Sequence, residues 1–81
     1  MSSAYTSWHG QLLKILRARS SEDAPAGTEP GLVVMASDGV GVVAGRGIVW
    51  LEEVQLAGRR VLPIAAFLRG AAGFVGSQLP T

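Results

Sequence analysis

Glycine and proline divide most of this chain into short apolar runs, and this spacing strongly limits what it can fold into. Eleven glycines and four prolines among 81 residues are typical of many tight turns, which favour short strands over long helices. The runs GLVVMAS (31–37), VGVVA (40–44) and IVWLEEVQL (48–56) are rich in β-branched residues and predict three strands. Asp38-Gly39 and the GRG at 45–47 predict the turns between them.

The remaining segments are read from their turn and helix signals. Pro63, followed by apolar residues and closed by Gly70, predicts a short helix. The polar segment SSEDAPAGTEP, residues 20–30, predicts a surface loop, and GFVGSQL (73–79) a last short strand. Consecutive hairpins with one short helix favour a small barrel or curled sheet.

Residues 11–19 allow two interpretations. Leu12, Ile15, Leu16 and Arg19 fall at helical spacing, and leucine, lysine, arginine and alanine favour helices. As a strand, the same segment places Leu13 and Ile15 on one face and Leu12 and Lys14 on the other. Propensity alone favours the helix.

Length and composition exclude several classes of protein. A chain of 81 residues makes one domain, residues 1–81. Its 48% hydrophobic and 16% charged content excludes a disordered tail. The absence of cysteine excludes disulfides and thiolate metal sites. With neither a signal peptide nor a membrane-spanning stretch in this sequence, we expect a cytoplasmic protein.

No catalytic or metal site is expected from these residues. His9 is the single histidine, and we interpret it as a polar residue at the start of a strand. Glu52 and Glu53 are adjacent and would point to opposite faces of a strand, so they cannot act as a catalytic pair. GVGVVA (39–44) matches a dinucleotide fingerprint, but another glycine turn follows it where a helix is needed. Trp8 and Trp50 are expected in the core or at its rim.

The sequence offers a more informative feature at Arg59 and Arg60. These adjacent arginines follow Gly58 at the end of an apolar run, which places them in a turn. Such a pair is either exposed to solvent or binds an anion. Phosphate is the expected anion, because guanidinium groups match the geometry of phosphate oxygens. The net charge of +1 is far below that of a dedicated nucleic-acid binder, so the residues alone favour a solvated turn.

Two segments resemble a known family. YTSWHGQLLKILRA, residues 5–18, is similar to the segment that opens the C-terminal domain of methionyl-tRNA formyltransferases, and residues 30–70 to the run that follows. The shared features are the Pro-Gly before a strand, the glycine hairpins, Gln-x-x-Gly with two basic residues, and Phe-Leu-x-Gly. His9 replaces a more usual asparagine, and Arg59-Arg60 stand where lysines are common.

The resemblance implies a mainly β fold: a small open Greek-key barrel, related to oligonucleotide-binding barrels, with one short helix near residues 63–70. It favours a strand over a helix at 11–19. It also implies an accessory tRNA-binding role beside an N-terminal catalytic domain, absent here, that uses 10-formyltetrahydrofolate. The chain alone would then be no enzyme, would hold no cofactor, and would self-associate through the surface exposed by separation from that domain.

Within that family role, the basic residues divide into two groups. Arg59 and Arg60 are expected to contact phosphates of initiator methionyl-tRNA, and Lys14 matches a lysine of the family's opening strand. The other arginines contribute at most to the positive field; they are Arg17, Arg19, Arg46 and Arg69.

Two alternatives stay open. The same type of domain occurs in relatives that formylate sugar nucleotides or act on formyl-folates, where it need not contact RNA. A free-standing barrel that adds a strand to a protein partner is the second alternative.

Overall fold

The computed structural model describes residues 4–22, 28–37 and 39–81, and it is mainly β. Six strands form one antiparallel sheet, accompanied by one short helix. The elements are β1 (Ala4–Trp8), β2 (Gln11–Ser21), β3 (Val33–Ala36), β4 (Gly39–Val43), β5 (Ile48–Leu56), β6 (Leu62–Pro63) and α1 (Ile64–Arg69). No helix within these ranges is long and apolar enough to cross a membrane.

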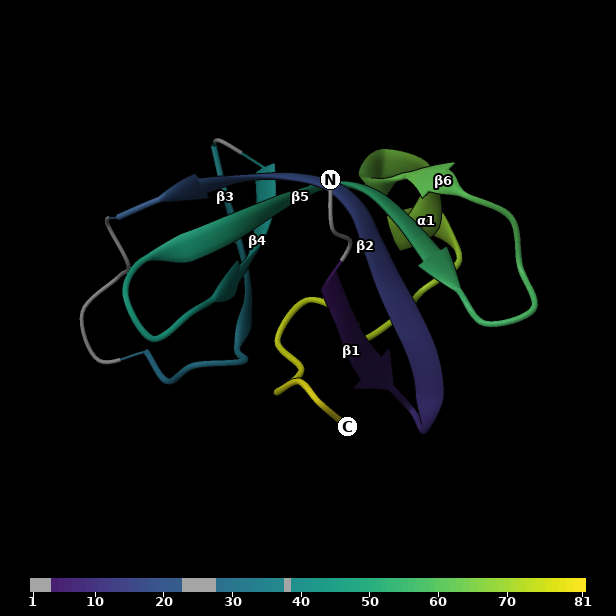
Figure 1. Ribbon diagram of the computed structural model, residues 1–81, viewed down its shortest axis with the longest axis horizontal. Helices are drawn as coiled ribbons and strands as arrows, with labels where there is room; N and C mark the ends of the chain where they lie inside the picture. Colours follow the sequence, from purple (N-terminus) through teal and green to yellow (C-terminus); the bar gives the residue numbers. More distant parts are fainter. Residues whose placement is uncertain (1–3, 23–27, 38) are drawn as a thin grey trace.

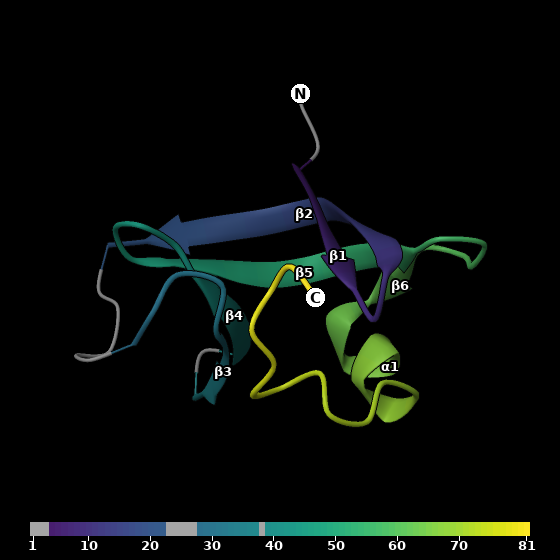
Figure 2. The same ribbon diagram turned by 90° about the horizontal axis from the view of Figure 1, so that it is seen from below.

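The sheet has a Greek-key order and stays open. Its strands follow the order β1-β2-β5-β4-β3, with β6 paired to the far end of β5. The meander β3–β4–β5 is therefore joined by β2, which lies beside β5. Figure 1 shows the long β2 and β5 strands crossing the molecule, and Figure 2 shows β3, β4 and α1 lying beneath this pair. The predicted small open barrel with one short helix is confirmed.

Residues 11–19 are strand, as the family resemblance implied and the helical spacing did not. Leu13 is fully buried, whereas its neighbour Leu12 is 47% exposed, the alternation of a strand with one covered face. The register against β5 shifts on either side of Arg17, and such bulges bend a strand. Strand β2 continues through Ser21, so the first two residues of the predicted loop are in the sheet. Residues 23–27 of that loop lie outside the described residues.

A hairpin that the sequence did not reveal joins β1 to β2. Trp8 pairs with Gln11, so His9 and Gly10 form a two-residue turn with φ of 52° and 76°. Positive φ at both positions is what the favoured hairpin turns require, and asparagine accepts it more readily than most residues. The interpretation of His9 as the start of a strand is therefore wrong. Its ring stacks on that of Trp8, with centroids 4.2 Å apart.

The predictions for the central strands and the helix are confirmed, but the one for the tail is wrong. Strands β3, β4 and β5 and helix α1 occupy the expected segments. The β3–β4 turn joins the paired residues Ala36 and Gly39, and Asp38 lies outside the described residues. Residues 73–79 form no strand and make one isolated bridge, Leu32 to Gln78. Positive φ values at Gly73 and Gly76 interrupt any extended run there.

The irregular C-terminal tail, residues 71–81, instead connects the two edges of the open sheet. On the β3 side, the Val33 amide donates to the Ser77 carbonyl at 2.9 Å, and the Gly76 amide donates to the Val33 carbonyl at 2.8 Å. On the β1 side, the Thr81 amide donates to the Ser7 carbonyl at 3.0 Å. The tail therefore satisfies backbone groups that an open edge would leave to water. Figure 2 shows it passing beneath the sheet.

The core lies between the curled sheet, α1 and the tail. Trp8, Phe67 and Phe74 pack edge to face, with centroids 5.0–5.9 Å apart, an arrangement that aromatic rings prefer. Trp50 is also buried, so both tryptophans are confirmed as packing residues. A Cβ at Gly41 would overlap the side chain of Ile48 and lie 2.9 Å from the Trp50 ring. Gly41 of GVGVVA therefore serves close packing of a strand, whereas Gly39 has a positive φ and open space around an added Cβ.

Candidate nucleic-acid interface

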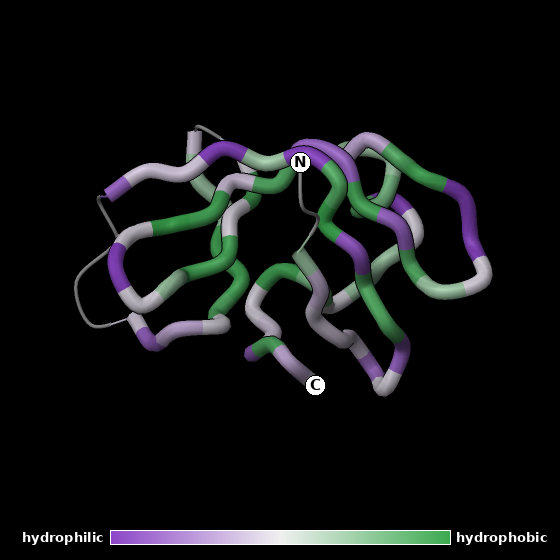
Figure 3. Tube along the Cα trace, viewed as in Figure 1, coloured by the Kyte–Doolittle hydropathy of each residue, from purple (hydrophilic) through white to green (hydrophobic). Residues whose placement is uncertain are grey.

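Arg59 and Arg60 lie in the exposed turn between β5 and β6. Gly58 has φ of 76°, the Arg59 amide donates to the Leu56 carbonyl at 2.9 Å, and Gln55 Nε2 donates to the Arg59 carbonyl at 2.9 Å. These bonds fix the backbone from which both side chains extend. Both arginines are exposed, and Figure 3 shows this turn as a strongly hydrophilic stretch at one end of the molecule.

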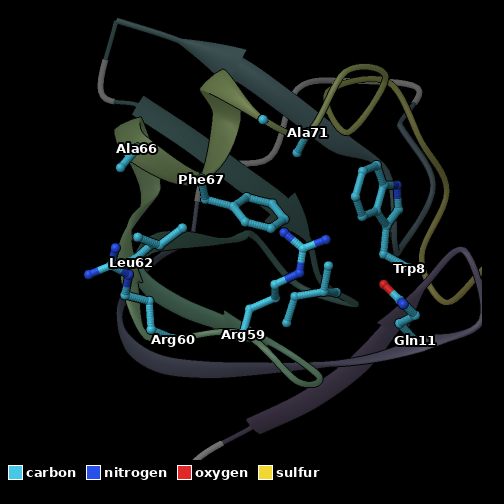
Figure 4. A pocket seen from close by; sticks show the side chains of 10 residues that line it. Trp8, Gln11, Arg59, Arg60, Leu62, Ala66, Phe67 and Ala71 are labelled. Atoms are coloured by element: carbon cyan, nitrogen blue, oxygen red, sulfur yellow. The ribbon is translucent and has the colours of Figure 1, made fainter.

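The two guanidinium groups point in different directions. Figure 4 shows the Arg59 side chain extending toward Phe67 and Trp8, into a pocket, whereas Arg60 turns outward beside Leu62. The turn therefore directs the Arg59 guanidinium into the pocket, while Arg60 lines the pocket with its guanidinium turned away. The two predicted residues therefore lie in one turn, but their guanidinium groups are not positioned to bind the same phosphate.

The Arg59 pocket has a volume of about 230 Å³ and a mostly apolar lining. Its polar side chains are Gln11, Arg59 and Arg60. Strand β1 contributes Trp8 and helix α1 contributes Phe67, so the wall is built from segments far apart in the sequence. The apolar wall consists of Trp8, Leu56, Leu62, Ala66, Phe67 and Ala71.

Lys14 lies on the other side of the same turn. It pairs across the sheet with Tyr5 of β1 and Gln55 of β5, and it lines a second hollow of about 160 Å³ together with Gly58. Leu56 lines both this hollow and the Arg59 pocket. The three residues predicted to contact phosphate are thus gathered around the end of β5.

The structure spreads the other four arginines over the molecule. Arg19 lies 3.6 Å from the Glu52 carboxylate and 5.7 Å from the centre of the Trp50 ring, so it covers a core residue. Arg17 pairs across the sheet with Glu53, and Arg69 ends α1. Arg46 follows β4 and precedes β5, so the nine residues of β5, roughly 30 Å long, separate it from the β5–β6 turn.

Sequence reasoning found the turn but not the pocket beside it. Trp8 was expected in the core, and Gln11 and Phe67 carried no signal as site residues. No local pattern could reveal the pocket, because it depends on β1, β2, β5 and α1 meeting in three dimensions. Within residues 4–22, 28–37 and 39–81, no group of three His, Asp or Glu side chains could hold a metal ion.

Comparison with known proteins gives one family. Residues 1–72 match the family model described as formyl transferase, C-terminal domain. The chain is 40% identical over 76 residues to the methionyl-tRNA formyltransferase of Roseiflexus castenholzii and 43% identical over 76 residues to that of Roseiflexus sp.. It is 39% identical over 77 residues to the enzyme of Thiobacillus denitrificans. Each alignment covers 94% of this chain but only 23–25% of the relative, so the chain spans about a quarter of their length.

Proposed function

The chain belongs to the formyl transferase C-terminal domain family, and from this we propose that it is the tRNA-binding C-terminal domain of a methionyl-tRNA formyltransferase. Its role is to hold initiator methionyl-tRNA through phosphate contacts. A catalytic domain outside these 81 residues transfers the formyl group from 10-formyltetrahydrofolate. The domain itself is an accessory part of that enzyme and performs no chemistry.

The observation that carries this proposal is the arrangement of cations around the β5–β6 turn. Arg60 extends outward from the turn, and Arg59 and Lys14 line the hollows on its two sides. Among the residues that the structure describes, neither hollow is lined by an Asp or Glu, so none of their carboxylates competes with an incoming phosphate. A guanidinium fork matches two phosphate oxygens at once, which suits an exposed arginine to an RNA backbone.

The test compares two exposed turn arginines at opposite ends of β5. Arg60→Ala and Arg46→Ala each remove one positive charge, so both change the net charge equally. Affinity for tRNA is measured by fluorescence anisotropy over a range of salt concentrations. The domain alone should bind weakly, with a Kd of roughly 10⁻⁴–10⁻⁶ M, the range of non-specific association. Arg60→Ala should weaken binding and reduce the log-log salt slope by about one unit, because one phosphate contact is lost.

Two further results bear on the proposal. Arg60→Ala should weaken binding to different tRNAs about equally, since phosphate contacts carry no sequence information. If Arg60→Ala and Arg46→Ala lower affinity to the same small extent, only net charge matters and the assignment of the turn is wrong. If the unaltered chain shows no salt-dependent binding to tRNA, the tRNA-binding role of this domain is wrong.

A further inference from the structure

Arg59 and Arg60 both line the pocket, but only the Arg59 side chain extends into it, and this divergence points to two different ligand groups at one turn (Figure 4). We propose that the Arg59 pocket binds one unpaired nucleotide of the RNA, with the base inside the pocket and the adjoining phosphate outside, near Arg60. This inference rests on the proposed function, because it takes RNA as the ligand. The proposed function alone requires contact only with the RNA backbone, whereas this pocket would also bind a base.

The size of the pocket limits what can enter it. A volume of about 230 Å³ is below the roughly 300–1,000 Å³ of pockets that hold a whole drug-sized ligand. This volume matches a single ring system better than an oligonucleotide segment or a complete cofactor. A base paired within a helix cannot reach into such a hollow, so the nucleotide must come from a loop, bulge or end where bases are unstacked.

The chemistry of the lining suits a base. A planar guanidinium such as that of Arg59 is suited to stacking on aromatic ring faces and to donating hydrogen bonds to ring and carbonyl acceptors of a base. Gln11 lies at the start of β2 and is exposed, and its amide offers both a donor and an acceptor to a base edge. The apolar wall, with Phe67 and Ala66 contributed by α1, provides the surface that a base needs when it leaves its stack.

An acidic side chain of a protein is the competing ligand. It would pair with Arg59 but would leave the apolar wall uncovered. The structure favours the base because the lining combines the inward guanidinium of Arg59 with an amide and six apolar residues, while the Arg60 guanidinium is turned away. The experiment below includes the acidic ligand as a separate arm.

Two neighbouring alanines of α1 give a matched pair of variants. Ala66 is half-buried and lines the pocket, whereas Ala65 is exposed and does not. Ala66→Leu narrows the pocket without changing charge, and Ala65→Leu makes the same substitution outside it. Binding is measured to a single-stranded RNA and to a blunt-ended RNA duplex of equal length.

Ala66→Leu should weaken binding to the single strand about 5- to 150-fold, the loss expected for one stacked base, and leave duplex binding unchanged. Ala65→Leu should alter neither. If Ala66→Leu affects both RNAs equally or affects neither, the pocket does not take a base. The proposed function survives that result if Arg60→Ala still reduces salt-dependent tRNA binding. Failure of both RNAs to bind the unaltered chain would remove the nucleotide site and the proposed function together.

A titration of the unaltered chain followed by NMR does not depend on how the leucine variants fold. Adenosine should shift the amide signals of Ala66, Phe67 and Gly70, which line the pocket. Ribose 5-phosphate and blocked aspartate should shift these signals less at equal concentration. If ribose 5-phosphate shifts them most, the pocket holds phosphate only. If blocked aspartate shifts them most, the pocket belongs to an acidic protein side chain. Either result would overturn the inference.

Discussion

Replacing Gly47 by alanine adds one methyl group where the β4–β5 turn lies against the end of β2. Gly47 has φ of 93°, a conformation that costs an L-residue about 1–2 kcal/mol. The new Cβ would overlap the Ser21 carbonyl oxygen and lie 2.8 Å from the Cα of Glu22. Because the obstacle is backbone, the strands must separate, and overpacking of this kind costs about 1–3 kcal/mol. Gly47→Ala should therefore destabilise the fold by about 2–5 kcal/mol in total.

That loss is large for a protein of this size. A chain of 81 residues is expected to have an unfolding free energy of about 4–12 kcal/mol. The assay is urea denaturation followed by the fluorescence of the buried Trp8 and Trp50. With a slope near 1 kcal/mol per M, the midpoint should fall by about 2 M or more, and Tm by roughly 10 °C or more.

Gly45 provides the control within the same turn. A Cβ at Gly45 meets nothing within 4 Å, and its φ is not positive. Gly45→Ala should therefore be neutral or stabilise the fold by up to about 1 kcal/mol, since alanine restricts the unfolded chain. Equal stability of the Gly45→Ala and Gly47→Ala variants would show that β2 does not end against this turn. The pairing of Ser21 with Ile48 would then be wrong.

Three other predictions concern a surface arginine, self-association and formyl transfer. Arg19→Ala should cost about 0.5–1.5 kcal/mol through loss of its contacts with Trp50 and Glu52, while Arg46→Ala changes the urea midpoint little. The chain should self-associate at millimolar concentration because Tyr5 and Leu12 are 60% and 47% exposed, and a monomer throughout sedimentation analysis would contradict this. Incubated with 10-formyltetrahydrofolate and methionyl-tRNA, the chain should transfer no formyl group, because the proposed function places catalysis in a domain outside these residues; any turnover above background would refute that.

The parts of the fold that could be predicted are those fixed by local chemistry. The glycine turns and the β-branched residues correctly predicted the positions of β3, β4 and β5, and Pro63 correctly predicted the start of α1. Strand β2 could not be assigned from its residues, because leucine, lysine and arginine favour a helix and Leu12, Ile15 and Leu16 fit its spacing. Pairing with β1 and β5 overrides that preference, and such long-range pairing leaves no local signal.

In the candidate site, too, local features could be predicted from the sequence and long-range contacts could not. The position of Arg59 and Arg60 in a turn was readable from Gly58 and the end of an apolar run. The different directions of their side chains could not be predicted, because these depend on where Trp8 and Phe67 lie beside the turn. His9 was misassigned for a different reason: its positive φ belongs to a hairpin turn that this residue type only weakly signals.

The tail that connects β1 and β3 also sets an order of events during synthesis. The Thr81 amide bonds to Ser7, and residues 76–79 bond to Gly31 and Val33, so neither contact can form until those residues have left the ribosome. All six strands and α1 lie before residue 70 and are made first. Until the tail follows, both strand edges remain available for pairing with other chains. Any delay in docking of residues 76–81 would therefore lengthen the time during which the edges of β1 and β3 can pair with other chains.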